Sequence, residues 1–166
     1  DEEGALWELF HVNSKTTRSD LFMPTEQMAA MMRQMPLSFA PASRSAIALP
    51  PPDESLLQER TLAEAMLQRS TPNDFVAAPL SMAELATLLH SCAGENRTPE
   101  QAGADRPFRV VPSGGALYPT ELYVHCRAVT GLEPGVYHYD PTEHALRLHL
   151  AGDQTEALSR ILVQPA

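Results

Sequence analysis

Residues 106–124 have the sequence RPFRVVPSGGALYPTELYV, in which a glycine-containing loop separates two short apolar runs. Pro112 fixes one backbone angle, and Gly114 and Gly115 lack the Cβ atom that would keep a ligand away from the main chain. Residues 122–126 are typical of a buried or half-buried strand. A loop of this kind before a strand suits a flat or phosphate-bearing ligand held by backbone N–H groups. An ordinary connection between two elements is the alternative.

Four motifs follow one another at short intervals: PSGGALYP (112–119), ELYV (121–124), GVYHYDP (135–141) and HAL (144–146). Their order and spacing resemble the flavin dehydrogenases of the SagB/ThcOx type, which are nitroreductase-fold proteins. Many of these proteins oxidise azoline rings in peptide natural products. The resemblance runs from about residue 49 to the end, with a fainter echo at 7–15, and covers the front half of such a domain. It implies an α+β fold with a central, mainly antiparallel sheet flanked by helices.

The resemblance also implies FMN as the cofactor and assigns roles to particular residues. The loop would approach the flavin ring mainly through backbone atoms, and an arginine–serine pair would hold the flavin phosphate. The cofactor-binding residues implied in this way are Arg69, Ser70, Pro112, Ser113, Gly114, Gly115 and Ala116. Tyr118 and Glu121 would border the substrate side and are the candidates for a catalytic role.

The phosphate element matches the flavin family only in part. Arg69 offers a planar fork of donors and Ser70 a hydroxyl, which suit a phosphate. A second arginine of the family pattern is missing, because Pro72 or Asn73 stands in its place. Arg69 could instead neutralise the C-terminal end of the helix that precedes it.

Composition narrows the function classes. The 166 residues carry a net charge of −9, which argues against a nucleic-acid partner because phosphate binding needs a basic face. No apolar run approaches the ~18 residues of a membrane span, and no basic segment precedes an apolar one as in a signal peptide. Cys92 and Cys126 give neither a disulfide framework nor metal-ligand spacing, so we expect a reducing cytoplasm. With Lys15 as the sole lysine, proton transfer would fall to histidine, tyrosine or carboxylate groups.

The chain divides, by composition, into an arm at 1–53 and the front half of a nitroreductase-like domain at 54–166. The arm contains a helix at 25–35, whose methionines at helical spacing fit flexible core filling or, alternatively, a soft-metal or peptide surface. A Pro- and Ser-rich linker or surface-hugging arm follows at 36–53. Three histidines, His138, His144 and His149, raise a metal hypothesis, but their spacing favours structural roles and no metal is expected.

Helix-opening patterns and a hairpin are predicted in the second part. Capping boxes open helices at 61–69 and 81–93, and a third box opens one at 153. The second helix is expected to present Leu85, Leu88, Leu89 and Cys92 on one face and to stop at Gly94. Residues 95–105 are expected to form a polar loop. Residues 136–140 and 145–150 are predicted to pair as a hairpin.

Two function classes remain open from the sequence. In the first, the chain is part of an FMN-dependent dehydrogenase or oxidase acting on a peptide or small molecule. In the second, it is a non-catalytic nitroreductase-like subunit that serves as a scaffold or binds a peptide. In both, open sheet edges and apolar helix faces would favour a dimer or a second polypeptide that completes the fold.

Overall fold

The computed structural model describes residues 25–38, 45–57, 60–71, 73–74 and 78–161, in two compact units, Asp1–Met35 and Pro36–Ala166. In the first unit, helix α2 spans Thr25–Gln34, which confirms the helix predicted at 25–35. What its methionines pack against stays a prediction. The echo of the flavin family at 7–15 and Lys15 lie outside the described residues.

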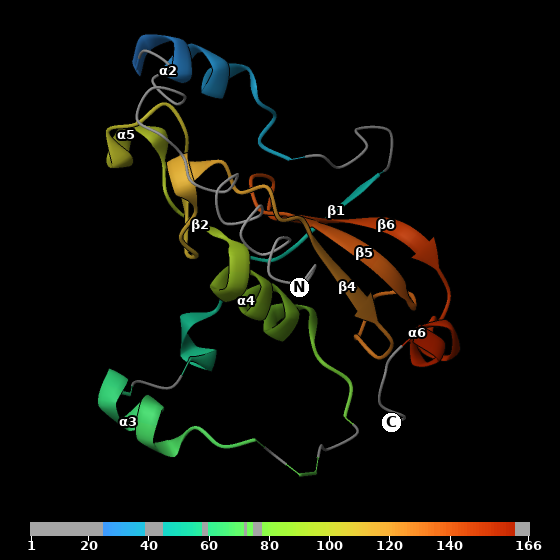
Figure 1. The fold of residues 1–166 in the computed structure, drawn as a ribbon. Coiled ribbons are helices and arrows are strands. Elements are labelled where there is room, and N and C mark those ends of the chain that lie inside the picture. Colours follow the sequence, from blue (N-terminus) through green and yellow to red (C-terminus); the bar gives the residue numbers. More distant parts are fainter. Residues whose placement is uncertain (1–24, 39–44, 58–59, 72, 75–77, 162–166) are drawn as a thin grey trace, which may run out of the picture. The chain divides into compact units, whose positions relative to one another are not determined.

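The second unit is built on a four-stranded antiparallel sheet (Figure 1). Its strands, in spatial order, are β1 (Ala46–Ala48), β6 (Ala145–Ala151), β5 (Gly135–Asp140) and β4 (Leu122–Cys126). The predicted strand at 122–126 and the predicted hairpin of β5 and β6 are confirmed. The α+β fold with a mainly antiparallel sheet flanked by helices is therefore the one expected from the sequence.

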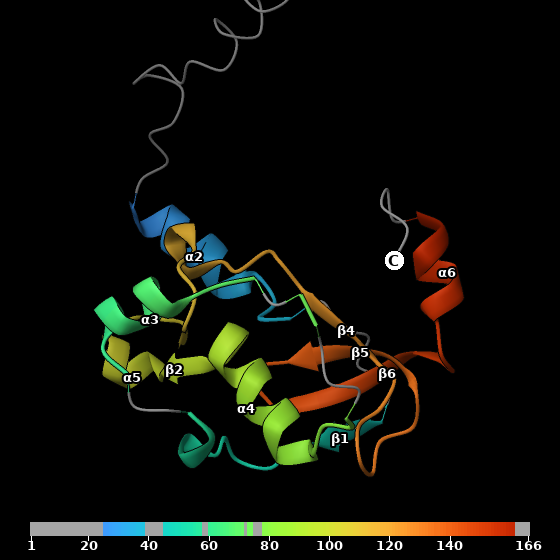
Figure 2. The ribbon, with the colours of Figure 1, turned by 90° about the horizontal axis from the view of Figure 1, so that it is seen from below.

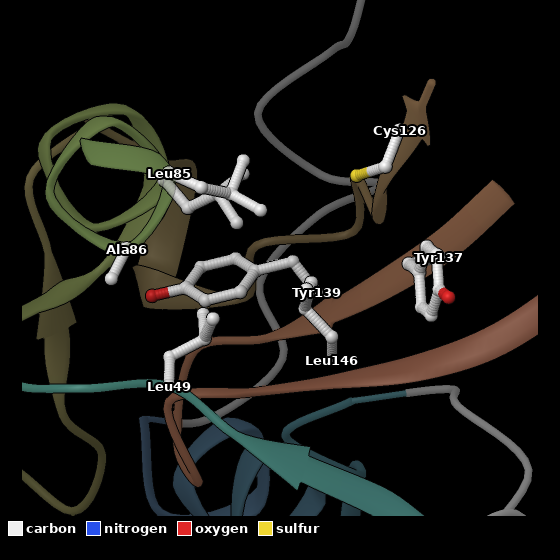
Figure 3. Close-up of a cluster of buried hydrophobic side chains, with 8 residues drawn as sticks. Leu49, Leu85, Ala86, Cys126, Tyr137, Tyr139 and Leu146 are labelled. Carbon is white, nitrogen blue, oxygen red and sulfur yellow. The ribbon is translucent and has the colours of Figure 1, made fainter. Parts of the chain in front are cut away.

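Helix α4 (Met82–Ala93) packs on one face of this sheet (Figure 2). The predicted capping box is present, because Ser81 and Glu84 exchange hydrogen bonds, and Gly94 ends the helix. Its core contacts come from Leu85 and Leu89, and Figure 3 shows Leu85 and Ala86 beside the ring of Tyr139. The core cluster comprises Leu49, Leu85, Ala86, Leu89, Cys126, Tyr137, Tyr139 and Leu146.

Part of the predicted helix face is wrong. Leu88 is 53% exposed and Cys92 is exposed, whereas Ala86 and Thr87 are buried. The helix is rotated toward Ala86, and a polar contact favours that rotation, since the Thr87 hydroxyl accepts a hydrogen bond from the Asp53 N–H at 2.9 Å. The spacing of apolar residues along the helix could not predict this hydrogen bond.

Residues 95–105 are not simply a loop, which corrects the expectation for that segment. They contain strand β2 (Glu95–Arg97), which pairs with β3 (Phe108–Arg109), and the short helix α5 (Pro99–Ala102). Thr98 and Gln101 form a capping box around Pro99 at the first helical turn. These elements are too short for a periodicity signal, although the cap itself is visible in the sequence.

The remaining elements are short and lie outside the sheet. They are η1 (Glu54–Leu56), α3 (Leu62–Gln68), η2 (Gly114–Ala116) and α6 (Thr155–Ile161). The predicted helix at 61–69 is confirmed as α3, with its capping box, and the helix expected after 153 is confirmed as α6. The segment 36–53 supplies β1 and the core residue Leu49, and a domain boundary at residue 53 stays a prediction.

Candidate functional site

The loop between β3 and β4 has an unusual backbone. Gly115 has φ 64° and ψ 18°, a conformation that glycine adopts without steric cost. Ala116 (φ 52°) and Tyr118 (φ 44°) also have positive φ, which is uncommon for residues with a side chain and costs ~1–2 kcal/mol each. Strain of this kind persists only where surrounding contacts hold it, and it occurs often at binding sites.

Three contacts hold this backbone in place, and all of them involve Tyr118. The Ser113 hydroxyl oxygen accepts a hydrogen bond from the Tyr118 N–H at 2.9 Å. The phenol oxygen of Tyr118 accepts one from the Arg109 N–H at 2.9 Å. The Arg109 guanidinium lies over the Tyr118 ring, 4.9 Å from its centroid. The two ends of the loop are therefore joined to each other, and Tyr118 joins its C-terminal end to β3.

The glycine segment of the loop is open to the outside. Pro112, Gly114 and Gly115 are exposed, while Ser113 and Ala116 are half-buried. A Cβ atom added at Gly114 would meet nothing within 4 Å. A flat ligand can therefore approach the main chain closely at Gly114, and the role of these residues beside a flavin ring stays a prediction.

The side chain of Glu121 is in close, buried contact with that of His138. Its Oε2 atom lies 2.5 Å from Nε2 of His138 on β5, and the two side chains are 14% and 2% exposed. Ser38 also donates a hydrogen bond to Oε2, at 3.5 Å. The His138 ring contacts Tyr123 edge-on at 5.1 Å. Sequence reasoning missed His138 as the partner, but the register pairing Leu122 with Tyr139 places the two side chains close together.

Arg69 and Ser70 are placed apart from these contacts. Arg69 is the C-cap of α3, where its N–H bonds the Ala65 carbonyl, and both Arg69 and Ser70 are exposed. Within the described residues, no hydrogen bond joins either of them to the loop. Their role in holding a phosphate stays a prediction. The residue that the structure does bring to the loop, and that the sequence did not single out, is Arg109.

The remaining histidines of the metal hypothesis have other partners. His144 Nε2 lies 2.9 Å from the Pro50 carbonyl oxygen, so this nitrogen carries a hydrogen, and Nδ1 lies 2.9 Å from the Tyr139 hydroxyl. Burial lowers the pKa of His144 and raises the pKa of Tyr139 to about 12. His149 contacts Tyr123 edge-on. Within the described part of the chain, no group of three metal-ligating side chains is present.

Two known proteins are similar in sequence to part of this chain. A protein of Methanocaldococcus jannaschii named as a nitroreductase is 34% identical over 90 residues, which are 54% of this chain and 42% of that protein. The trifolitoxin-processing protein TfxB of Rhizobium leguminosarum bv. trifolii is 35% identical over 82 residues, 48% of this chain and 22% of that protein. No family model matches the chain.

Two solved structures of proteins named as nitroreductases have a similar fold. The crystal structure of a protein named as a nitroreductase from Ralstonia eutropha matches with a TM-score of 0.50 and 30% identity, over 69% of this chain and 48% of that one. A second, from Anabaena variabilis, matches with a TM-score of 0.53 and 24% identity, over 92% and 27%. The chain thus has a nitroreductase-like fold and spans less than half the length of each of these relatives.

Among the described residues, no helix combines the length and the apolar character that crossing a bilayer requires.

Proposed function

We propose that the chain is part of an FMN-dependent dehydrogenase or oxidase that oxidises azoline rings, or a related group, in a peptide natural product. The observation that carries the proposal is the strained loop at 113–118, with its exposed Gly114 and Gly115, held by contacts to Tyr118. Similarity to proteins named as nitroreductases supports an oxidoreductase. Similarity to a protein named for processing trifolitoxin supports a role in maturing a natural product.

In this proposal the chain binds and orients the flavin. The backbone of Ser113, Gly114, Gly115 and Ala116, after the rigid Pro112, would lie against the ring. When bound, a flavin accepts a hydride or two electrons and a proton from the substrate. The protein's part is to position that ring and to exclude water from it.

Tyr118 and Glu121 are the candidate residues on the substrate side. Tyr118 has a phenol hydroxyl beside the loop, and Glu121 has a carboxylate whose orientation is fixed by His138. A carboxylate held in this way can orient a polar substrate group, but its freedom to move a proton is reduced while it is paired with His138. Tyr118 is therefore the stronger candidate for direct contact with the substrate.

Arg69 and Ser70 are proposed to hold the flavin phosphate, which gives a direct test. FMN titrated into the protein is followed by flavin fluorescence, with Arg69→Ala as the variant. Loss of a charge-assisted contact should weaken FMN binding by ~1.5–3 kcal/mol, roughly ten- to a hundredfold. Arg160→Ala is the matched control, because Arg160 is equally a surface arginine and its ion pair with Glu156 is exposed. Equal affinity in wild type and Arg69→Ala would leave Arg69 with a role at the helix end only.

A non-catalytic, nitroreductase-like scaffold is the alternative. It is favoured by the absence of the second arginine of the phosphate element, where Pro72 or Asn73 stands, and by the exposure of Arg69 and Ser70. The visible absorption spectrum of the purified protein separates the two functions. Flavin bands that survive gel filtration support the enzyme, and a colourless protein that does not take up added FMN supports the scaffold.

We further propose a cytoplasmic assembly in which this chain associates with additional polypeptide, either a second chain that completes the fold or a dimer partner. The support is a set of exposed apolar side chains around η1 and α3, where Leu62 is 77%, Met66 70% and Leu67 87% exposed. Exposed apolar clusters favour association. Size-exclusion chromatography with light scattering tests this: an ~18 kDa monomer that melts cooperatively would contradict it.

A further inference from the structure

We propose that Arg109 and Tyr118 together form a binding site for an oxyanion, a carboxylate or a phosphate. The inference goes beyond the proposed function, because the site requires only these two side chains and no flavin. It rests on the position of one buried guanidinium group and on the hydrogen-bonding capacity of one phenol.

Arg109 carries a nearly buried positive charge without a carboxylate partner. The residue is 9% exposed, and its guanidinium Nη2 donates a hydrogen bond to the Leu37 carbonyl at 2.9 Å. In the described part of the chain, no ion pair includes it. Its cross-strand neighbour is Glu95, whose carboxylate instead accepts a hydrogen bond from the Thr142 hydroxyl at 2.7 Å.

A buried charge of this kind normally has a counter-charge. Arginine has five N–H donors, and a carbonyl and a ring face compensate the charge only in part. Desolvated charges are costly unless they are paired, so buried arginines are rare without a carboxylate or phosphate. The guanidinium nitrogens that do not bond Leu37 are not completely enclosed by the protein, so the group keeps some contact with its surroundings. These donors are available to an anion that arrives from solution.

Tyr118 adds a second donor next to the first. Its phenol oxygen accepts the hydrogen bond from the Arg109 N–H, which leaves the hydroxyl hydrogen to be donated elsewhere. Among the described residues, no acceptor takes that hydrogen, and the side chain is half-buried. The ring lies under the guanidinium, which is 4.9 Å from its centroid, on a residue whose φ is 44°. The phenol and the guanidinium thus belong to one contact between Arg109 and Tyr118.

This combination selects an oxyanion. Both groups donate, one is permanently charged, and guanidinium geometry matches carboxylate and phosphate oxygens. The protein's net charge of −9 repels anions at long range, so binding must come from local contacts and will be salt-sensitive. Two natural sources of such an oxyanion are the carboxylate of a substrate and the phosphate of a cofactor, and the second would replace the role proposed above for Arg69 and Ser70.

Isothermal titration of the full chain with inorganic phosphate, and separately with acetate, at low ionic strength tests the site. We expect one saturable site in the wild type. Arg109→Gln should weaken binding about ten- to a hundredfold, and Tyr118→Phe, which keeps the ring, should weaken it several-fold. The matched control is Arg97→Gln, since Arg97 also lies over a ring, that of Phe108 at 4.8 Å, but is exposed. Absence of saturable binding to wild type, or equal loss in Arg97→Gln, would overturn the proposal.

Folding of Arg109→Gln is checked by circular dichroism, and Arg109→Lys provides a second variant. Lysine keeps the charge but not the fork of donors, so we expect an intermediate loss; full affinity in a folded Arg109→Lys protein together with an unaffected Tyr118→Phe would also overturn the site. FMN and riboflavin identify the source. If Arg109→Gln weakens the binding of FMN but not of riboflavin, the site takes the phosphate of the cofactor. If the wild type prefers acetate and Arg109→Gln binds both flavins as the wild type does, the site takes the carboxylate of a substrate. The phosphate and acetate titrations stand even if no flavin binds.

Discussion

Replacing Ser113 with alanine should loosen the loop that carries the candidate site. The Ser113 hydroxyl oxygen is the acceptor for the Tyr118 N–H, at 2.9 Å. Two side-chain-bearing residues, Ala116 and Tyr118, have positive φ and store ~1–2 kcal/mol each. The three contacts that hold Tyr118 are each worth ~0.5–1.5 kcal/mol, which is about the same total. The closed loop is therefore only narrowly favoured, and one lost contact shifts the balance.

The expected shift is about 1 kcal/mol, which raises the open population roughly fivefold. Hydrogen exchange of the 110–122 segment, followed by mass spectrometry, measures this directly, and the Tyr118 amide should lose its protection. Ser113→Thr keeps a hydroxyl acceptor and is the control, with wild-type exchange expected. Unchanged exchange in Ser113→Ala would show that the hydrogen bond does not hold the loop, and that the positive φ values have another cause.

Two further predictions concern groups in the core. Burial raises the pKa of the Cys126 thiol, so a thiol reagent should modify the exposed Cys92 rapidly and Cys126 only on unfolding; two fast thiols would contradict the packing of β4. Burial lowers the pKa of His144 below its value of ~6.5 in the unfolded chain, so the stability it contributes is complete above that pH and is lost as the pH falls. In denaturant unfolding between pH 7.5 and 5, the free energy of unfolding should fall less in His144→Asn than in the wild type, and asparagine tolerates the positive φ at this position. An identical fall in the two proteins would contradict a buried neutral His144.

Local sequence signals predicted much of the fold. Strand 122–126, the hairpin of β5 and β6, and helices α3 and α4 follow from apolar patterns and capping boxes, which depend on residues near one another in the chain. The burial of Thr87 in place of Leu88 was not predictable in this way. It depends on Asp53, which is 34 positions away. The cross-strand pairing of Glu121 with His138 is a long-range feature of the same type.

The candidate site was likewise predictable from the sequence only in part. The glycine loop was recognisable from its motif, and its open backbone fits that assignment. The contact of Arg109 with Tyr118 was not, because arginine in a short apolar run gives no pattern that separates a buried guanidinium from a surface one. It depends on the fold of the loop, in which Tyr118 turns back to the main chain of β3.

The central claim, that the 113–118 loop lies against a flavin, is tested most directly by FMN binding to Gly114→Ala. A methyl group here meets nothing within 4 Å in the protein and needs no positive φ, so stability should be unchanged. Against a bound ring the same methyl should cost ~1–3 kcal/mol, roughly tenfold or more in affinity. Gly131→Ala is the control: its φ of 83° strains alanine, so this protein should be less stable, yet it should bind FMN as the wild type does because Gly131 lies outside the loop. The account predicts weakened FMN binding in a fully stable Gly114→Ala protein; wild-type affinity in that variant would contradict it.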